Sequence, residues 1–165
     1  NGTEVLIDRE SIKRFPNGKI EYVEPVKECT LRVGPQMITF SHERGFFFYS
    51  DGNLRSGGLP DYADLLVGER KITFGCLHND CRDKEWSIRR VCRMIDFHRN
   101  GAVYRGTLAG KTVFTVEGRT YTLKQMDSVE FDPAGRPIKG WFGWTRDNRV
   151  RVYFQTRDYR RYPYD

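Results

Sequence analysis

The sequence predicts an all-β fold, an antiparallel meander of repeated β-hairpins that form an open twisted or rolled sheet. Three observations lead to this prediction: a segment recurs at a fixed offset, apolar and polar residues alternate within it, and glycine-containing pairs interrupt the alternation. A period of two is typical of strands with one buried and one solvated face. Glycine pairs suit tight hairpin turns, whose central residues need positive φ. The length of 165 residues fits a single domain.

The chain contains an internal repeat at an offset of 34. Residues 31–40 and 65–74 share six of ten positions, and the aromatic-to-glycine elements that end at Gly18 and Gly52 have the same offset. Two more such elements end at Gly101 and Gly135, while the larger offset between Gly52 and Gly101 indicates an insertion between the second and third copies. The predicted division is into repeats at about 7–40, 41–74, 90–123 and 124–154, an insertion at 75–89 and a tail at 155–165.

Each repeat is predicted to contain two successive hairpins. The turn pairs are Asn17-Gly18, Asp51-Gly52, Asn100-Gly101, Glu117-Gly118 and Asp147-Asn148. A period of 34 also occurs in two-helix repeats, but the alternation of Phe114, Val116, Tyr121 and Leu123 with threonines is the pattern of strands.

Three segments fit the hairpin pattern less well. Residues 144–154 form a shortened last copy of the second element, as expected for a terminal repeat. Pro60–Leu66 has the composition of a short helical turn with proline near its start. The spacing of 83–93 is mixed, and we expect an irregular strand there because 91–97 precedes a glycine turn.

The repeat unit Phe-x-x-Asn-Gly-x-x-x-x-Gly-x-Leu is complete from Phe97 to Leu108 and degenerate at 51–59 and 131–142. In these windows the chain resembles the MORN repeat family. The resemblance implies consecutive hairpins in a long twisted sheet, used for contacts with proteins or lipids and as antitoxin-like or exported modules in bacteria. The chain departs from the family pattern in its longer repeat and in a first copy, 15–25, that lacks the second glycine.

Composition and charge favour a folded protein with an anionic or aromatic partner. Hydrophobic residues make up 38% of the chain and aromatic residues 14%, which supplies large side chains for a core. The net charge is +6 from 28 basic and 22 acidic residues, and 20 of the basic residues are arginine. Arginine pairs bidentately with carboxylates and phosphates and stacks on aromatic rings. No apolar run approaches the roughly 20 residues of a membrane-spanning helix.

The four cysteines are expected to form disulfides in an exported protein. Four is an even number, and the chain begins at Asn1-Gly2-Thr3 without an initiator methionine, as after removal of a signal peptide or after trimming. The favoured pair is Cys76 with Cys81, which leaves Cys29 and Cys92 to bond or to remain buried thiols. Cys76, His78 and Cys81 have metal-ligand side chains, but their spacing does not match known zinc motifs. No metal or cofactor is predicted.

No catalytic residue is predicted. The histidines His42, His78 and His98 lie beside turns or in the insertion, outside any known nucleophile motif. The carboxylates Asp61, Asp64, Asp80 and Asp83 are candidates for acid-base chemistry by position alone. An enzyme, such as a hydrolase, with a site assembled across the sheet therefore remains an alternative.

The C-terminal segment is the predicted partner-binding site. Its arginines and tyrosines interleave, and the candidates are Arg146, Arg149, Arg151, Tyr159, Arg160, Arg161 and Tyr162. We expect a non-enzymatic exported module that binds a protein or an anionic glycan, with its oligomeric state open. One alternative is an intracellular nucleic-acid-binding protein, since arginine with aromatic residues binds phosphates and stacks on bases. Another interpretation is a charged strand that prevents edge aggregation, followed by a disordered tail.

Overall fold

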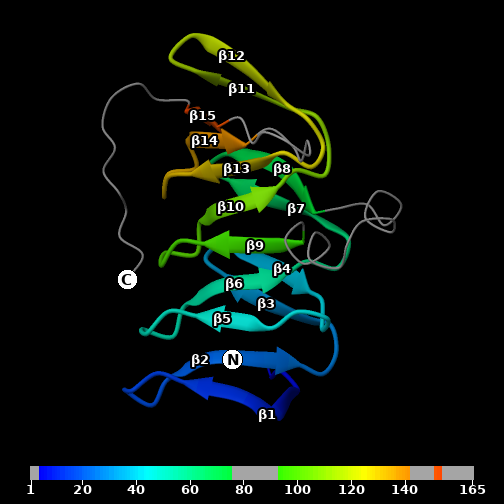
Figure 1. Cartoon of the computed structure of the whole chain (residues 1–165), viewed down its shortest axis with the longest axis vertical. Helices are drawn as coiled ribbons and strands as arrows, with labels where there is room; N and C mark the ends of the chain where they lie inside the picture. The colour runs from blue at the N-terminus through cyan, green and yellow to red at the C-terminus, as the bar shows by residue number, and fades with distance from the viewer. Residues whose placement is uncertain (1–3, 76–92, 142–150, 154–165) are drawn as a thin grey trace.

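The computed structural model describes residues 4–75, 93–141 and 151–153, and within them it is all-β (Figure 1). These residues form strands β1 to β15, every pairing of which is antiparallel, and they contain no helix and no sheet closed into a barrel. The predicted all-β hairpin fold is therefore confirmed.

The hairpins lie in two layers. The first layer is a nine-stranded sheet in the order β1-β2-β5-β6-β9-β10-β13-β14-β15. Its strands are β1 (Ile7–Arg14), β2 (Ile20–Pro25), β5 (Phe46–Phe48), β6 (Leu54–Gly58), β9 (Met94–Phe97), β10 (Val103–Thr107), β13 (Ser128–Phe131), β14 (Pro137–Trp141) and β15 (Arg151–Tyr153). The second layer has three separate hairpins: β3 (Cys29–Val33) with β4 (Gln36–Phe40), β7 (Tyr62–Val67) with β8 (Arg70–Gly75), and β11 (Thr112–Val116) with β12 (Arg119–Leu123).

Within the described residues, four turns of the nine-stranded sheet share one backbone conformation and line up along one side of the sheet (left in Figure 1). In each, one N–H donates to the carbonyl four residues later, and the glycine N–H donates back to the carbonyl three residues earlier, all at 2.8–2.9 Å. The residues that begin these turns are Phe15, Tyr49, His98 and Asp132, and the glycines are Gly18, Gly52, Gly101 and Gly135. The glycine φ angles lie between +80° and +96°, a region that side chains disfavour.

Glycines in the sheet make room for aromatic rings of the second layer. Along one row of the inner face, Ile95 pairs with both Gly57 and Gly106, and Gly106 also pairs with Val129. A Cβ on Gly57 would lie 2.8 Å from the ring of Phe40, and one on Gly106 would lie 2.6 Å from the ring of Phe74. The second glycine of the repeat unit is thus a packing site for a ring.

The core fills the space between the two layers. The largest side chains in it are phenylalanines, which meet edge to face, as in the contacts of Phe40 with Phe46 and of Phe74 with Phe131. The fully buried large side chains are Phe40, Phe46, Phe74, Phe97, Phe114, Phe131, Ile38, Leu59, Leu65, Ile95, Leu108 and Leu123.

Turns of the second-layer hairpins contact turns of the nine-stranded sheet that lie two repeats later in the chain. A Cβ on Gly34, in the turn of β3–β4, would lie 3.3 Å from the carbonyl oxygens of Asn100 and Gly101. Gly68, in the turn of β7–β8, approaches the turn of β13–β14 in the same way, with Ala134 O at 3.0 Å. The first two hairpins of the second layer therefore each touch the sheet turn that belongs to the second repeat after their own.

Two segments differ from the sequence-based prediction. The helical turn expected at Pro60–Leu66 is wrong, because β7 begins at Tyr62 and its Leu65 and Val67 are buried. The last copy also differs, since β15 pairs with β14 and so joins the nine-stranded sheet. This pairing covers the backbone groups that β14 would otherwise expose at the sheet edge.

Candidate functional site

The outward side of the three second-layer hairpins, here called the hairpin face, exposes several large apolar side chains. They alternate with buried residues such as Ile38 and Leu65, so strand geometry directs them away from the core. The described residues expose six large apolar side chains, and the four on the hairpin face are Met37 (63%), Tyr62 (57%), Leu66 (43%) and Val113 (43%). The other two are Leu6 and Val26, at the N-terminal end.

Side chains join neighbouring hairpins into a continuous surface. Gln36 donates to the carbonyl of Leu66 at 3.0 Å and accepts from the N–H of Leu66 at 2.6 Å. One repeat later, Arg70 donates to the carbonyl of Val113 at 3.0 Å, and its guanidinium carbon lies 5.4 Å from the ring centroid of Phe114. Gln36 and Arg70 occupy equivalent positions of consecutive repeats, so the repeat itself links the hairpins.

Short polar pairs and charged side chains occupy the rest of the hairpin face. The hydroxyls of Thr30 and Thr39 lie 2.8 Å apart across β3 and β4. At the equivalent positions of the next hairpin, Thr73 donates to the Asp64 carboxylate at 2.6 Å. The surface also carries charges, since exposed Arg32 lies opposite Met37 across β3 and β4 and exposed Lys71 lies opposite Leu66 across β7 and β8. It therefore combines apolar side chains with hydroxyl groups and charges of both signs.

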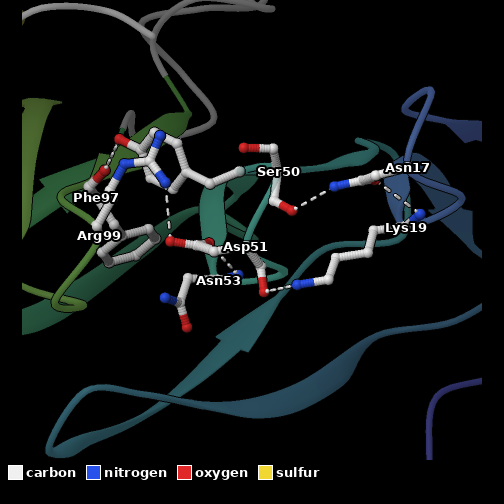
Figure 2. A network of polar contacts seen from close by, with 8 residues as sticks. Asn17, Lys19, Ser50, Asp51, Asn53, Phe97 and Arg99 are labelled. Atoms are coloured by element: carbon white, nitrogen blue, oxygen red, sulfur yellow. Dashed lines mark hydrogen bonds and ion pairs between the residues drawn. The ribbon is translucent and has the colours of Figure 1, made fainter.

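The turns of the nine-stranded sheet, residues 14–19, 48–53, 97–102 and 131–136, form a polar edge, here called the turn ridge. Figure 2 shows the contacts that join its first three turns. Asn17 donates to Ser50 O at 3.1 Å, and Lys19 Nζ donates to Asp51 O at 2.8 Å. Arg99 Nη1 lies 2.9 Å from Asp51 Oδ2 (Figure 2). Side chains thus join consecutive turns.

Two equivalent side chains link the ridge from repeat to repeat. Tyr49 Oη donates to Phe97 O at 2.7 Å, and His98 Nε2 lies 2.9 Å from Phe131 O. In both cases the first residue of one turn reaches the residue just before the next turn. The Arg99 guanidinium also lies 4.8 Å from the Tyr49 ring centroid. The ridge is therefore pre-ordered by its own contacts.

Asp51 is held in its charged form. Asn53 N donates to Asp51 Oδ1 at 2.9 Å, and this backbone hydrogen bond, together with Arg99, lowers the pKa of Asp51 below its ordinary value of 3.8. Desolvation opposes the shift. The carboxylate of Asp51 pairs with Arg99, whereas Lys19 donates to the backbone carbonyl of Asp51.

The outer face of the nine-stranded sheet carries a row of paired side chains that sequence analysis missed. The cross-strand register aligns Lys13, Tyr22, Phe47, Ser56, Asp96, Arg105, Glu130 and Lys139. Within the row Tyr22 packs on Phe47 with ring centroids 4.8 Å apart, and Arg105 pairs with Asp96 at 2.6 Å. Because most of these groups contact each other, the face offers less to a partner than the hairpin face does.

The structure separates the predicted acid-base candidates that it describes. Asp61 forms an ion pair with Arg93 at 3.1 Å, whereas Asp64 accepts from Thr73. His42 is exposed, and His98 is a link of the turn ridge. No group of three His, Cys, Asp or Glu among the described residues is arranged to hold a metal ion. His78, Asp80 and Asp83 lie outside the described residues.

Most of the predicted disulfide and partner-binding residues lie outside the described residues. Cys29 is a free thiol, and partial burial raises its pKa above the ordinary value of 9.0. Arg151 begins β15. The residues outside the described ranges are Cys76, Cys81, Cys92, Arg146, Arg149, Tyr159, Arg160, Arg161 and Tyr162.

The described body is nearly neutral. Residues 4–75 and 93–141 hold 18 of the 28 basic residues but 16 of the 22 acidic residues. Most of the net charge of +6 therefore belongs to the remaining segments. A binding surface in the described body depends on the local arrangement of side chains, since it has little net charge to attract a partner.

Comparisons with known proteins assign no family. No protein-family model matches the chain, and neither the curated proteins nor the solved structures contain a match. Within the described residues, no helix has the length and apolar character needed to cross a membrane.

Proposed function

We propose that this protein is a non-enzymatic, exported binding module and that the hairpin face contacts a partner protein. The observation that carries the proposal is the position of the exposed apolar side chains, four of six of which lie on this face. Exposed apolar groups gathered on one surface are typical of interaction sites. Methionine at such a surface adapts to the shape of its partner, and Met37 is the most exposed of the four.

A protein suits the hairpin face better than a polyanion does. Protein interfaces have an apolar centre in which charged residues are depleted. On the hairpin face Met37 and Leu66 belong to hairpins joined by Gln36. The charges beside them are of both signs, Arg32 and Lys71 with Asp64, which suits a protein surface with mixed charges. A polyanion would instead need a concentration of cations.

The experiment compares two double variants as immobilised baits. Met37→Ser with Leu66→Ser removes apolar groups from the hairpin face, and Leu6→Ser with Val26→Ser removes similarly exposed apolar groups elsewhere. Proteins bound from a cell-envelope extract are quantified by mass spectrometry. We expect a specific partner to fall on the order of tenfold in the first variant and to stay unchanged in the second. Equal recovery on both baits would reject the hairpin face as the contact surface.

The exported location is tested by the state of the thiols in the cellular protein. Alkylation before and after reduction, read by intact mass, separates disulfides from free thiols. A Cys76–Cys81 disulfide is expected in an oxidising compartment. Four free thiols with retained zinc would contradict export and favour the intracellular alternatives.

A nucleic-acid-binding function is the alternative carried by the arginine-rich C-terminal segment. It requires affinity for a single-stranded oligonucleotide that falls steeply with salt, because bound counterions are released. Salt-independent capture of a protein partner together with no oligonucleotide binding would exclude it.

A further inference from the structure

We propose that the turn ridge binds a linear sulfated glycan. The ridge carries four basic residues and two acidic ones, which gives it a local excess of positive charge. The basic residues are Arg14, Lys19, Arg99 and Arg136, all of them exposed, and the acidic residues are Asp51 and Asp132. This site consists of other residues than the hairpin face, although the turns of β3–β4 and β7–β8 touch the ridge, and it does not depend on the binding of a protein there.

The acidic side chains of the ridge form hydrogen bonds and ion pairs with other residues of the ridge. Asp132 is only 5% exposed, and its carboxylate accepts hydrogen bonds from the N–H groups of Ala134 and Arg136, each at 2.9 Å. Arg136, which also pairs with this carboxylate, is 72% exposed. Asp51 is held by Asn53 and Arg99. The cations therefore face solvent more than the carboxylates do, and an incoming anion meets positive charge first.

The spacing of the ridge fits a polymer with regularly placed charges. Consecutive turns of the sheet are two strands apart, which corresponds to about 10 Å. This distance is comparable to the length of one disaccharide unit, over which sulfate groups recur in a linear glycan. Because the turns are joined by the contacts of Asn17, Lys19 and Tyr49, little side-chain conformational freedom remains to be lost on binding.

The aromatic groups of the ridge favour a glycan over a nucleic acid. Stacking on single-stranded bases needs open aromatic faces. The guanidinium of Arg99 lies over the ring of Tyr49, whose hydroxyl is bonded to Phe97 O, and the ring of His98 meets Tyr104 edge to face at 5.0 Å. Exposed amides at Asn53 and Asn100 add hydrogen-bond donors suited to hydroxyl and sulfate oxygens.

The test titrates the full chain with a heparin oligosaccharide at low salt and at increasing salt. Lys19→Gln with Arg136→Gln removes two ridge charges, and Lys27→Gln with Lys71→Gln removes two exposed charges from other surfaces. We expect the ridge variant to bind on the order of tenfold more weakly and its log–log salt slope to fall by about 2. The control should retain the affinity of the unchanged chain to within a small factor.

Three results would overturn the inference. The first is no saturable heparin binding at low salt. The second is the same result in both variants, since an equal loss would show that overall charge binds heparin and no loss in either would show that another segment does. The third is tighter binding of a single-stranded oligonucleotide than of heparin. The hairpin-face variant Met37→Ser with Leu66→Ser separates the two proposals, since it should bind heparin normally even if it loses the protein partner.

Discussion

Individual glycines fix the approach of one layer to the other. Gly52 and Gly101 have nearly the same turn conformation, with φ of +96° and +80°. Only Gly101 is covered, since a Cβ there would lie 2.5 Å from the backbone nitrogen of Gly34, whereas nothing lies within 4 Å of a Cβ on Gly52. Gly52 is therefore needed only for its positive φ, whereas Gly101 is needed both for its positive φ and for the close approach of Gly34.

Replacing these glycines with alanine separates the two roles. Gly52→Ala should destabilise the fold by about 1–2 kcal/mol, because alanine disfavours positive φ. Gly101→Ala should lose about 1–3 kcal/mol more, because its Cβ overlaps a backbone that cannot rotate away. Urea unfolding measures both variants. Equal losses would contradict the contact between the turns of β3–β4 and β9–β10.

Asp51 makes the stability of the turn ridge sensitive to acid. Its pKa is lower in the folded chain than its ordinary value of 3.8, so its contribution to stability is present above that value and is lost as the pH falls through the folded pKa. Asp51→Asn should therefore be less stable than the unchanged chain at neutral pH, with the difference disappearing once the pH falls below the folded pKa of Asp51. Urea unfolding across pH 2–7 measures this, and a difference that grows towards low pH would contradict the assigned contacts.

The first and last hairpins of the array carry side chains at positions where the middle hairpins have glycine. Position 23 of β2 is the first-repeat equivalent of Gly57, yet it holds Val23, whose side chain is buried where Gly57 instead leaves room for an aromatic ring. At the other end, Glu117 stands at the turn position of Gly34 and Gly68, with φ of +51°. A side chain is possible there because no described residue lies within 4 Å of a Cβ on Gly118 in the β11–β12 turn.

A reciprocal exchange tests this difference between hairpins. Gly68→Glu should destabilise the chain by about 2 kcal/mol or more, since it adds both positive-φ strain and a Cβ only 3.0 Å from Ala134 O. Glu117→Gly should be neutral or stabilising by up to about 1 kcal/mol, because glycine relieves the strain. Thermal unfolding measures both changes. Similar losses in the two variants would contradict the difference in turn packing between β7–β8 and β11–β12.

The sequence predicts the hairpins well and their layers poorly. Period-two alternation and glycine pairs locate the turns at Gly18, Gly52 and Gly101, because these signals are local. The division into layers depends on contacts such as Gly34 with Gly101, and both kinds of hairpin have the same alternating pattern. The strand at Tyr62–Val67 was missed for a similar reason, since Pro60 signals a helix start while core packing of Leu65 and Val67 stabilises a strand.

The whole molecule presents surfaces that its sequence does not reveal. Arg99 and Asp51 are distant in the chain but adjacent on the ridge, and Met37 and Leu66 share the hairpin face because Gln36 joins their hairpins. The insertion and the C-terminal arginines stand out in the sequence because they depart from the repeat. The hairpin face and turn ridge consist of repeat positions, so only the folded arrangement shows them.

The two proposed surfaces should behave independently. Loss of Met37 and Leu66 side chains is expected to leave heparin affinity unchanged, and loss of the charges at Lys19 and Arg136 is expected to leave capture of the protein partner unchanged. Residues on separate surfaces usually contribute additively. Measuring both binding reactions on both variants checks this, and mutual loss would point to one shared site or to a disturbed fold.

Both surfaces depend on which turn of the nine-stranded sheet each second-layer hairpin contacts. Nuclear Overhauser contacts between the α-protons of glycines in opposed turns test it most directly. We expect contacts between Gly34 and Gly101 and between Gly68 and Gly135, the pairs in closest approach. Contacts of Gly34 with Gly52, or of Gly68 with Gly101, would instead place each hairpin one repeat earlier and contradict the account.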